Sequence, residues 1–570
     1  MAAPSPPPPI STPRTTDETL RETFEAIVIA LILAFIFRAY VIEAFVIPTG
    51  SMAPTLLGKH VAVGCEQCGY EFTADQSGRS HTGRDPLVLP CPMCHYPQEV
   101  PATTPTRSGD RLLVQKYVYS LAEPRRWDVV VFRNPQALND NGTPGPKTNY
   151  IKRLVGLPNE ALQIIDGNVY VRPLDGPRDG WEIARKTDPK ANRHWQRIQR
   201  AVWQPVYHSQ YVPLDHGRSE RRPLPWSSPW KAAAAEQGRW EIHSEARGWH
   251  RAYRWTPAAD PGSESDAHEN AAPRGELRFD WVGYHGRGTW YPYNVTVLQD
   301  GVVGRQPIED VRLAATVVPE TPGVAVELET TTRFDAQAER VVARFDALGN
   351  MTLRRISPTE TQTLGSVRGA VKWAVGQAEA IELWSVDQEL LVWVNGCVVW
   401  RRAFDWPESV IVGRPAPLDR PEVSLRVVGG GATLHAVELD RDLAYTPTLS
   451  SSLENAPYGV SRRAATGDLL RSPPIVIRPG RYFVLGDNSP ISSDGRFWND
   501  IEPWIRKRML PEAEAWRLSD IPDAERNYAQ VVPRGLMIGR AFFIYLPAPY
   551  AVQPRGRQIV PNFGEMRLIH

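Results

Sequence analysis

The sequence predicts a mainly β protein of several domains, with one apolar helix near its beginning. The chain has 570 residues, enough for more than one domain, and its 53 prolines and 42 glycines favour loops and short strands over long helices. An uncharged run, AIVIALILAFIF, occupies 26–37. Further on, ELLVWVNGCVVWRR at 389–402 places Asn395-Gly396 between two apolar runs, which is typical of a tight β-hairpin.

The apolar run predicts a transmembrane helix over 20–43, because about 20 residues are needed to cross a bilayer. A Pro-rich tail at 1–19, containing PSPPPPISTP, precedes it and is typical of disorder. A buried core helix and a cleaved signal peptide are the alternatives. Asp17, Glu18, Glu22 and Glu25 lie where a signal peptide would carry basic residues, so we interpret the segment as an anchor.

The overall charge excludes one class of partner. Lys and Arg total 65 and Asp and Glu total 64, so the chain is close to neutral. Nucleic-acid binding domains are strongly basic, and we therefore expect no nucleic-acid partner.

A single serine stands in the stretch PTGSMAPTL at 48–56, shortly after the apolar run. Pro48 and Pro54 each fix one backbone dihedral, and Gly50 permits a close backbone approach, so the Ser51 hydroxyl is held in a stiff turn. A serine hydroxyl is a weak nucleophile and needs a base. None of the twelve histidines lies in a recognisable triad motif.

A lysine can serve as that base if it is buried, because burial disfavours the charged form. To act near neutral pH its pKa would have to fall by about 3 units from about 10.4. The stretch NYIKRLVGLPNE at 149–160 supplies a candidate in Lys152, which in a strand would share one face with Tyr150 and Leu154. A solvated edge lysine is the alternative for this residue taken alone.

These stretches form an ordered set with three others: GDRLLVQKYVY at 109–119, WDVVVFRNP at 127–135 and FVLGDNSPISSDGR at 483–496. The set resembles the bacterial type I signal peptidases, which are membrane-bound Ser/Lys proteases. The resemblance covers about 20–56, 109–172 and 465–546. It implies a catalytic core of antiparallel β-sheets built from 44–175 and 446–570, with no cofactor needed for catalysis.

The resemblance implies roles for individual residues. Ser51 would be the nucleophile, and Lys152 the general base and then the acid. The backbone N–H of Ser51 and the hydroxyl of Thr49 would form the oxyanion hole. Ser492 would orient the lysine, and Asp494 and Arg496 would form a supporting ion pair. After Gly486-Asp487-Asn488 the family usually has a charged pair; Ser489 and Pro490 replace it here, in a loop rather than in the dyad.

Six apolar residues match positions that line the shallow substrate pockets of the family. They are Phe45, Ile47, Met52, Leu56, Tyr150 and Ile151. Small apolar pockets select small side chains, as in Ala-x-Ala cleavage sites. Ordinary core packing is the alternative, and it applies to Leu56 in particular.

The function implied is that of a membrane-anchored serine endopeptidase that removes signal peptides from exported preproteins. Its partners would be preproteins, membrane lipid and the secretion translocon. The chain would cross the cytoplasmic membrane once, with its N-terminus inside and its catalytic part outside. A non-enzymatic surface binding protein on a peptidase scaffold is one alternative. A second is a self-cleaving Ser/Lys repressor, but those are soluble and bind DNA, unlike this anchored and nearly neutral chain.

Four cysteines lie in an insertion at 57–108. GCEQCGY supplies Cys65 and Cys68, PCPMCHYP supplies Cys91 and Cys94, and 22 residues separate the two pairs. This spacing is close to that of a zinc ribbon with four thiolate ligands and predicts a structural zinc site. Two disulfides are the alternative. Cys397 lies alone in an apolar stretch, and we expect it in the core.

A larger insertion separates the last two motif regions. A Trp-, Arg- and Pro-rich linker is predicted over 176–274, and a concanavalin- or laminin-G-like β-sandwich over 275–445. Fifteen of the 19 tryptophans lie between 181 and 406. We expect them to fill the sandwich core; exposed tryptophans that stack on a ligand are the alternative.

Overall fold

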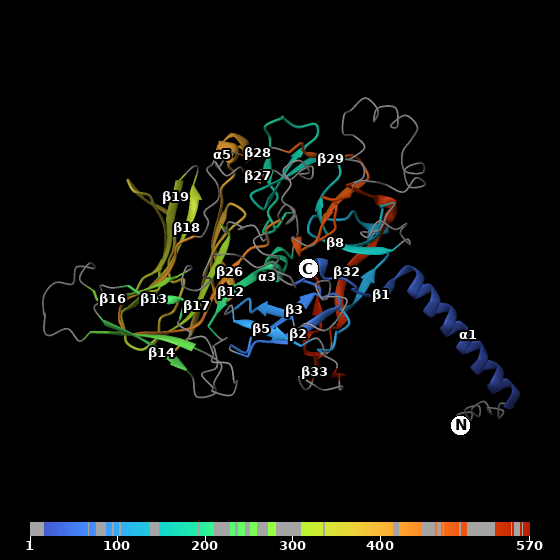
Figure 1. Ribbon diagram of the computed structural model, residues 1–570, viewed down its shortest axis with the longest axis horizontal. Coiled ribbons are helices and arrows are strands. Elements are labelled where there is room, and N and C mark those ends of the chain that lie inside the picture. The colour runs from blue at the N-terminus through green and yellow to red at the C-terminus, as the bar shows by residue number, and fades with distance from the viewer. Residues whose placement is uncertain are drawn as a thin grey trace, which may run out of the picture.

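The computed structural model confirms a mainly β protein (Figure 1). It describes residues 16–66, 68–75, 87–93, 96–101, 104–136, 148–190, 194–209, 228–233, 238–244, 251–258, 272–280, 309–334, 337–413, 421–445, 462–463, 469–470, 472–489, 492–498, 530–548, 550–551, 559–560 and 563–570. The tail at 1–15 lies outside these residues.

The N-terminal helix α1 (Thr16–Tyr40) extends away from the rest of the molecule (Figure 1). Its segment Leu20–Tyr40 is long and apolar enough to cross a membrane, and none of it is buried in the protein. Side chains such as Ile29, Leu33 and Phe35 are more than half exposed. So much uncovered apolar surface on one helix suits lipid as its surroundings. The helix ends three residues before the predicted boundary at 43, because strand β1 begins at Ile42.

Two sheets form the part of the chain that carries the serine and lysine motifs. The larger is antiparallel, with β35 joined to β32 at its side. Its strands, in spatial order, are β1 (Ile42–Val46), β6 (Arg111–Gln115), β32 (Met537–Leu546), β7 (Val129–Arg133), β8 (Asn149–Gly156), β30 (Arg481–Leu485) and β31 (Val532–Pro533), with β35 (Arg567–Leu568). The smaller sheet has the order β11 (Glu182–Ile183), β10 (Asn168–Pro173), β9 (Glu160–Ile165) and β29 (Ile475–Ile477). Strands that precede and strands that follow the larger insertion therefore pair within each sheet.

The cysteine-containing insertion folds as two short hairpins. Strand β2 (His60–Gly64) pairs with β3 (Glu71–Asp75), and β4 (Leu87–Pro90) pairs with β5 (Pro97–Val100). Cys65 and Cys68 lie in the turn of the first hairpin, and Cys91 begins the turn of the second. The hairpins share a small core with these three cysteines. They also contact the larger insertion, where the backbone N–H of His208 donates to Met93 Sδ at 3.3 Å.

The larger insertion forms a sandwich of two antiparallel sheets, which lies on the opposite side of the molecule from α1 (Figure 1). One sheet has the order β14 (Gly238–Ser244), β15 (Arg251–Pro257), β26 (Ala432–Arg441), β17 (Val311–Pro319), β22 (Glu379–Val386), β23 (Glu389–Val394) and β24 (Cys397–Ala403), with β12 (Gln204–His208) also on β26. The other has the order β13 (Trp230–Ala232), β16 (Arg274–Phe279), β25 (Val423–Gly429), β18 (Val324–Phe334), β19 (Gln337–Phe345), β20 (Met351–Ile356) and β21 (Thr361–Val367). The sandwich thus begins at β12 rather than at 275, because four strands of the expected linker pair with it.

Short elements complete the fold. These are α2 (Val118–Leu121), α3 (Trp195–Val202), α5 (Glu408–Gly413), the 3₁₀ turns η1 (Gly50–Met52), η5 (Arg534–Leu536) and η6 (Phe563–Glu565), and two two-stranded pairs, β27 (Arg462–Arg463) with β28 (Leu469–Leu470) and β33 (Tyr550–Ala551) with β34 (Ile559–Val560).

The predicted hairpin at Asn395-Gly396 is confirmed. Both residues have positive φ, 47° and 77°, and they connect the paired residues Val394 and Cys397. The expected burial of Cys397 is wrong: the residue is exposed, because it lies directly beside the turn.

The tryptophans of the insertion belong to two different hydrophobic cores. Trp230 and Trp255 pack in the main core between the two sheets of the sandwich. Trp384 and Trp393 instead pack against Trp195 and Trp203, which lie on or next to α3. Arg200 of α3 lies over both of the sheet tryptophans, with its guanidinium carbon 5.2 and 4.8 Å from their ring centroids. The second group therefore attaches the sandwich to the segment that enters it.

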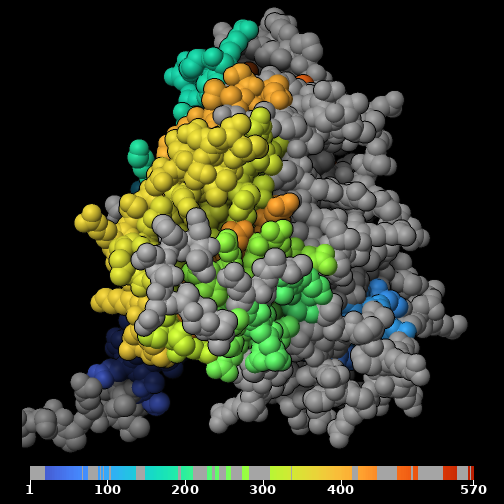
Figure 2. Space-filling view, turned by 90° about the vertical axis from the view of Figure 1, so that its left-hand side faces the viewer, coloured from blue at the N-terminus to red at the C-terminus, as the bar shows by residue number. Residues whose placement is uncertain are grey.

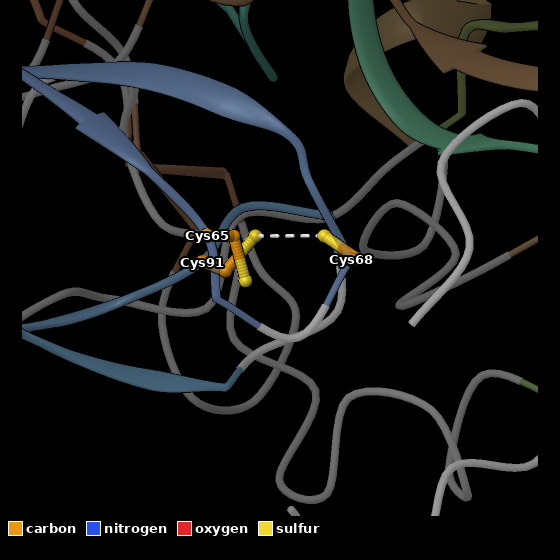
Figure 3. A group of neighbouring side chains, drawn as sticks. All are labelled: Cys65, Cys68 and Cys91. Atoms are coloured by element: carbon orange, nitrogen blue, oxygen red, sulfur yellow. Dashed lines mark hydrogen bonds between the residues drawn. The ribbon is translucent and has the colours of Figure 1, made fainter. Parts of the chain in front are cut away.

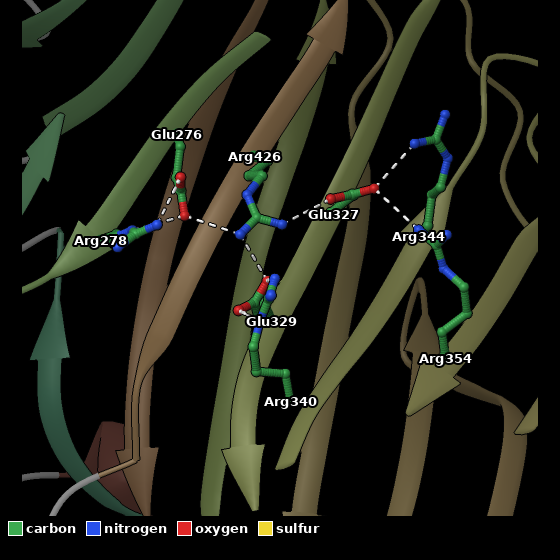
Figure 4. Close-up of polar contacts among 8 residues, drawn as sticks. All are labelled: Glu276, Arg278, Glu327, Glu329, Arg340, Arg344, Arg354 and Arg426. Carbon is green, nitrogen blue, oxygen red and sulfur yellow. Dashed lines mark hydrogen bonds and ion pairs between the residues drawn. The ribbon is translucent and has the colours of Figure 1, made fainter. Parts of the chain in front are cut away.

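A network of arginines and glutamates covers part of the sheet that contains β18 (Figure 4). Arg426 contacts Glu276, Glu327 and Glu329, while Arg340 forms a two-pronged pair with Glu329 at 2.6 and 2.8 Å. The carboxylates are largely buried beneath more exposed guanidinium groups. Figure 2 shows the molecule from the side of the sandwich, in yellow and green. Such a network keeps a broad sheet face polar and so disfavours edge-on or face-on association.

Candidate active site

Ser51 occupies a tight turn immediately after β1. The turn η1 closes through a hydrogen bond from Ala53 N–H to Gly50 O at 3.0 Å, and all three of its residues are buried. The turn packs closely against Gly58: a Cβ on this glycine would lie 2.1 Å from the carbonyl carbon and oxygen of Thr49. A side chain at 58 would therefore displace the serine turn, which explains the need for glycine there.

Lys152 approaches Ser51 from β8, in the middle of the larger sheet. In this structure Lys152 Nζ donates a hydrogen bond to Ser51 Oγ at 2.5 Å. Both residues are buried, with exposed fractions of 4% and 9%. The Lys152 amine also lies 5.5 Å from the centroid of the Tyr150 ring. The sheet thus joins two residues that are 101 positions apart in the sequence into one buried Ser/Lys pair.

The last motif lies against the same turn. A Cβ on Gly486 would be 2.1 Å from Ser492 Oγ and 2.4 Å from Ser51 O, so both residues pack closely around this glycine. Ser492 Oγ is buried and has no hydrogen-bond partner among the described residues. The bond from Ser492 to Lys152 that the resemblance implies is not made in this structure. Asp494 and Arg496 form a fully buried ion pair at 2.7 Å.

A second buried ion pair links the lysine strand to the serine turn. Arg153 follows Lys152 on β8 and contacts both carboxylate oxygens of Asp487 at 2.8 and 2.6 Å. Asp487 also accepts a hydrogen bond from Thr55 Oγ1 at 2.5 Å. Burial by itself would lower the pKa of Arg153, but the facing Asp487 carboxylate outweighs it and holds the pKa above its usual value. Arg153 therefore keeps its positive charge.

The sequence motifs indicated no role for Arg153, Asp487 or Thr55. The sequence did contain two residues from which this ion pair could have been suspected: the arginine directly after the candidate lysine, and the aspartate of the last motif. Charges on separate strands can be paired only when the sheet order is known, and β8 and β30 are neighbours in the sheet.

Thr49 and the six predicted pocket residues differ in how far they are exposed to solvent. Thr49 is exposed and adopts an extended conformation with φ −123° and ψ 157°. Of the six pocket candidates, Ile47, Met52 and Leu56 are buried in one core cluster, and Phe45 and Ile151 pack at its margin. Tyr150 belongs to a different cluster, with Phe132 and Leu154. The partly exposed Phe45, Tyr150 and Ile151 are therefore the ones that a bound peptide could reach.

The described cysteines of the ribbon-like insertion form a compact thiol cluster (Figure 3). The sulfur atoms of Cys65, Cys68 and Cys91 lie within 4.8 Å of one another, and Cys68 Sγ is 3.6 Å from Cys91 Sγ. This separation is longer than a disulfide bond of about 2.05 Å. It is close to the roughly 3.8 Å between thiolates on a tetrahedral zinc with Zn–S bonds of about 2.3 Å. The three residues present could hold a metal ion; Cys94 lies outside the described residues.

The two cysteine turns have the same backbone pattern. Cys65 N–H donates to Tyr70 O at 3.0 Å, and Cys91 N–H donates to Tyr96 O at 2.9 Å. In each case the bond closes the hairpin five residues after the first cysteine of a pair. Met93 N–H also donates to Cys91 Sγ at 3.4 Å. Backbone N–H groups directed at sulfur favour the thiolate form that binds metals.

Comparison with known proteins agrees with the motif regions. The family model described as "Signal peptidase, peptidase S26" matches residues 20–78 and 95–216, which include Ser51 and Lys152. The chain is 26% identical over 161 residues to "Signal peptidase I" of Rickettsia bellii (strain OSU 85-389), which is 28% of this chain and 43% of that protein. It is 29% identical over 161 residues to "Signal peptidase I" of Leptolyngbya laminosa, which is 28% of this chain and 54% of that protein. The chain thus spans about half the length of the curated relatives it matches.

Solved structures also align with part of the chain. A carbohydrate binding module, CBM66, from Bacillus subtilis aligns over 37% of this chain and 96% of its own, with a TM-score of 0.22 and 9% identity. A Bacillus licheniformis β-glucanase aligns over 38% of this chain and 94% of its own, with a TM-score of 0.23 and 10% identity.

The family match and the named relatives confirm the resemblance that the motifs indicated. The matched segments cover the anchor helix, the serine turn and the lysine strand. The motif at 483–496 lies beyond them but packs against the same serine. The part of this chain that brings Ser51 and Lys152 together is therefore related to the type I signal peptidases of family S26.

Proposed function

We propose that this protein is a membrane-anchored serine endopeptidase that removes N-terminal signal peptides from exported preproteins. The observation that carries the proposal is the buried 2.5 Å contact between Ser51 Oγ and Lys152 Nζ. A nucleophile needs a base within hydrogen-bond reach, and this lysine meets that condition. The family match and the membrane-capable helix support the substrate class.

The proposed reaction has two stages. Ser51 Oγ attacks the scissile carbonyl carbon while its proton passes to neutral Lys152, and the resulting oxyanion accepts hydrogen bonds from Ser51 N–H and the Thr49 hydroxyl. Collapse of this intermediate breaks the C–N bond, and Lys152 returns the proton to the departing amine. A water molecule then attacks the acyl-enzyme, giving its proton to Lys152, and Ser51 Oγ regains a proton as the signal peptide leaves.

Specificity for Ala-x-Ala-like sites is part of the proposal. The partly exposed Phe45 and Ile151 pack against the cluster that contains Met52, the residue after Ser51, and Tyr150 lies beside the Lys152 amine. Small side chains fit such shallow apolar surfaces best. We also propose a single-pass arrangement with the N-terminus in the cytoplasm, the catalytic part on the outer face, and preproteins delivered by the secretion translocon. The short link from α1 to β1 and Ser51 supports cleavage close to the membrane surface.

A cleavage assay tests the proposal. Detergent-solubilised wild type, Ser51→Ala and Lys152→Ala are each mixed with a preprotein that carries an Ala-x-Ala site, and the new N-termini are read by mass spectrometry. We expect cleavage after the last alanine by the wild type alone. A folded wild type that leaves the preprotein intact would favour a non-enzymatic scaffold instead.

We propose further that Cys65, Cys68, Cys91 and Cys94 bind a structural zinc ion, with Cys94 placed in the set by its sequence spacing. Zinc would supply no chemistry to the dyad; it would replace a larger hydrophobic core in the small hairpins. We expect about one zinc per chain by elemental analysis, and loss of that zinc with lower thermal stability in Cys65→Ser. Cys397→Ser is the matched control, since Cys397 is exposed and outside the cluster. A metal-free wild type with the four thiols oxidised would mean disulfides.

A further inference from the structure

Asn488 places one hydrogen-bond donor on each side of Ser51. Its side-chain Nδ2 donates to Gly50 O at 3.0 Å, and its backbone N–H donates to Ser51 O at 3.0 Å. The residue is almost fully buried, with 2% of its surface exposed. It comes from the loop after β30, so a segment distant in the sequence forms hydrogen bonds to the peptide groups before and after Ser51.

Two hydrogen bonds to Gly50 O fix the direction of the Ser51 N–H: the bond from Ala53 N–H that closes η1, and the bond from Asn488 Nδ2 on the distant loop, both at 3.0 Å. The peptide bond between Gly50 and Ser51 is trans, and in a trans peptide the C=O and N–H groups point in opposite directions. An amide that holds Gly50 O on one side therefore turns Ser51 N–H toward the other side. Ser51 N–H lies in the first turn of η1, where N–H groups have no partner within the helix, so it remains available to a ligand.

The surroundings hold Asn488 in place. Asp487 is fixed by the buried Arg153, and Gly486 leaves no room between the loop and Ser51 O. Asn488 Oδ1 is buried without a hydrogen-bond partner among the described residues. A buried acceptor without a partner lowers stability. That an amide is nevertheless present beside the serine indicates that its N–H donor, Nδ2, has a function there.

We propose that Asn488 is a positioning residue for the oxyanion hole. Its side-chain amide orients the Gly50–Ser51 peptide so that Ser51 N–H faces the oxygen of the tetrahedral intermediate. The inference rests on the proposed peptidase function. According to this inference, Asn488 stabilises the transition state and does not affect substrate binding.

The test compares Asn488→Ala and Asn488→Asp with Gln530→Ala. Gln530 is an apt control because it is also a buried amide that donates to one backbone carbonyl, Arg496 O at 3.2 Å, and has an unpartnered oxygen. We expect kcat on the preprotein to fall about 10- to 100-fold in both Asn488 variants, with KM changed less than about twofold. The carboxylate of Asn488→Asp has no donor to replace Nδ2, so this variant should not rescue the rate. Gln530→Ala should keep kcat within about threefold of the wild type, because its amide does not contact the serine turn.

A pair of inhibitors separates positioning from general structural damage. Affinity for a peptide aldehyde, which forms a tetrahedral adduct on the serine, should fall in parallel with kcat, while affinity for an uncleavable peptide with proline after the cleavage site should not. Equal kcat losses in Asn488→Ala and Gln530→Ala, or unchanged aldehyde affinity, would overturn the inference. If the wild type cleaves no preprotein, the proposed function fails first. The labelling rate of Ser51 by a peptidyl phosphonate then decides, and an equal rate in wild type and Asn488→Ala would refute the positioning role.

Discussion

Replacing Lys152 by arginine is expected to abolish cleavage while leaving the fold intact. Arginine is a long basic side chain like lysine and reaches slightly further, but a guanidinium does not give up its proton in proteins. It could keep a hydrogen bond to Ser51 Oγ but could not accept its proton. We expect the rate to fall by about 10⁴-fold or more, as for loss of a catalytic base in other serine proteases.

The pH dependence of the wild type is the companion measurement. A lysine base must be neutral before Ser51 attacks, so the rate should rise with pH as Lys152 loses its proton. A cleavage rate that stays constant between about pH 6 and 9 would contradict Lys152 as the base. Retention of substantial activity by Lys152→Arg, measured with the same preprotein, would do so as well. Circular dichroism and thermal unfolding of the variant would show whether the fold is retained.

The second large effect is expected from Asp487→Asn. This change leaves the guanidinium of Arg153 buried and without its counter-charge, since the side chain of Arg153 has no exposed surface. Breaking a buried ion pair by removing one partner costs about 3–5 kcal/mol. The loss should lower cleavage too, because Asp487 also holds Thr55 next to the serine turn. Urea unfolding in detergent, followed by tryptophan fluorescence, measures the change in stability.

Glu123→Gln serves as the control for that measurement. Glu123 also pairs with an arginine, Arg534, but its carboxylate is 78% exposed, and exposed pairs contribute only about 0–1 kcal/mol. If Asp487→Asn and Glu123→Gln destabilise the protein equally, the buried pair is not a structural link between the two segments.

Local patterns were sufficient wherever a feature depends on neighbouring residues. The apolar run predicted a helix that could span a membrane, because length and lack of charge are properties of one segment. Asn395-Gly396 predicted its hairpin, because both residues tolerate positive φ. The exposure of Cys397 was missed, since an apolar stretch does not indicate which of its residues lies beside the turn.

The start of the sandwich and the pairing of buried charges depended on contacts between distant segments. Strand β12 joins the sandwich by pairing with β26, which lies far along the chain, so no local pattern marks it as sheet. Arg153 and Asp487 are 334 positions apart and meet only because β8 and β30 are neighbours.

The sequence by itself determined the chemistry, because each chemical feature lies in a short, separate stretch. These features are the serine in a stiff turn, the lysine in an apolar strand, the thiol pairs and the anchor. Only the tertiary structure decided the geometry that makes this chemistry usable. It brought Lys152 to 2.5 Å from Ser51 and placed Asn488 across the peptide that precedes the serine. The physical reason is that side-chain type is a local property, whereas burial, hydrogen bonding and orientation are set by strands that pair across hundreds of residues.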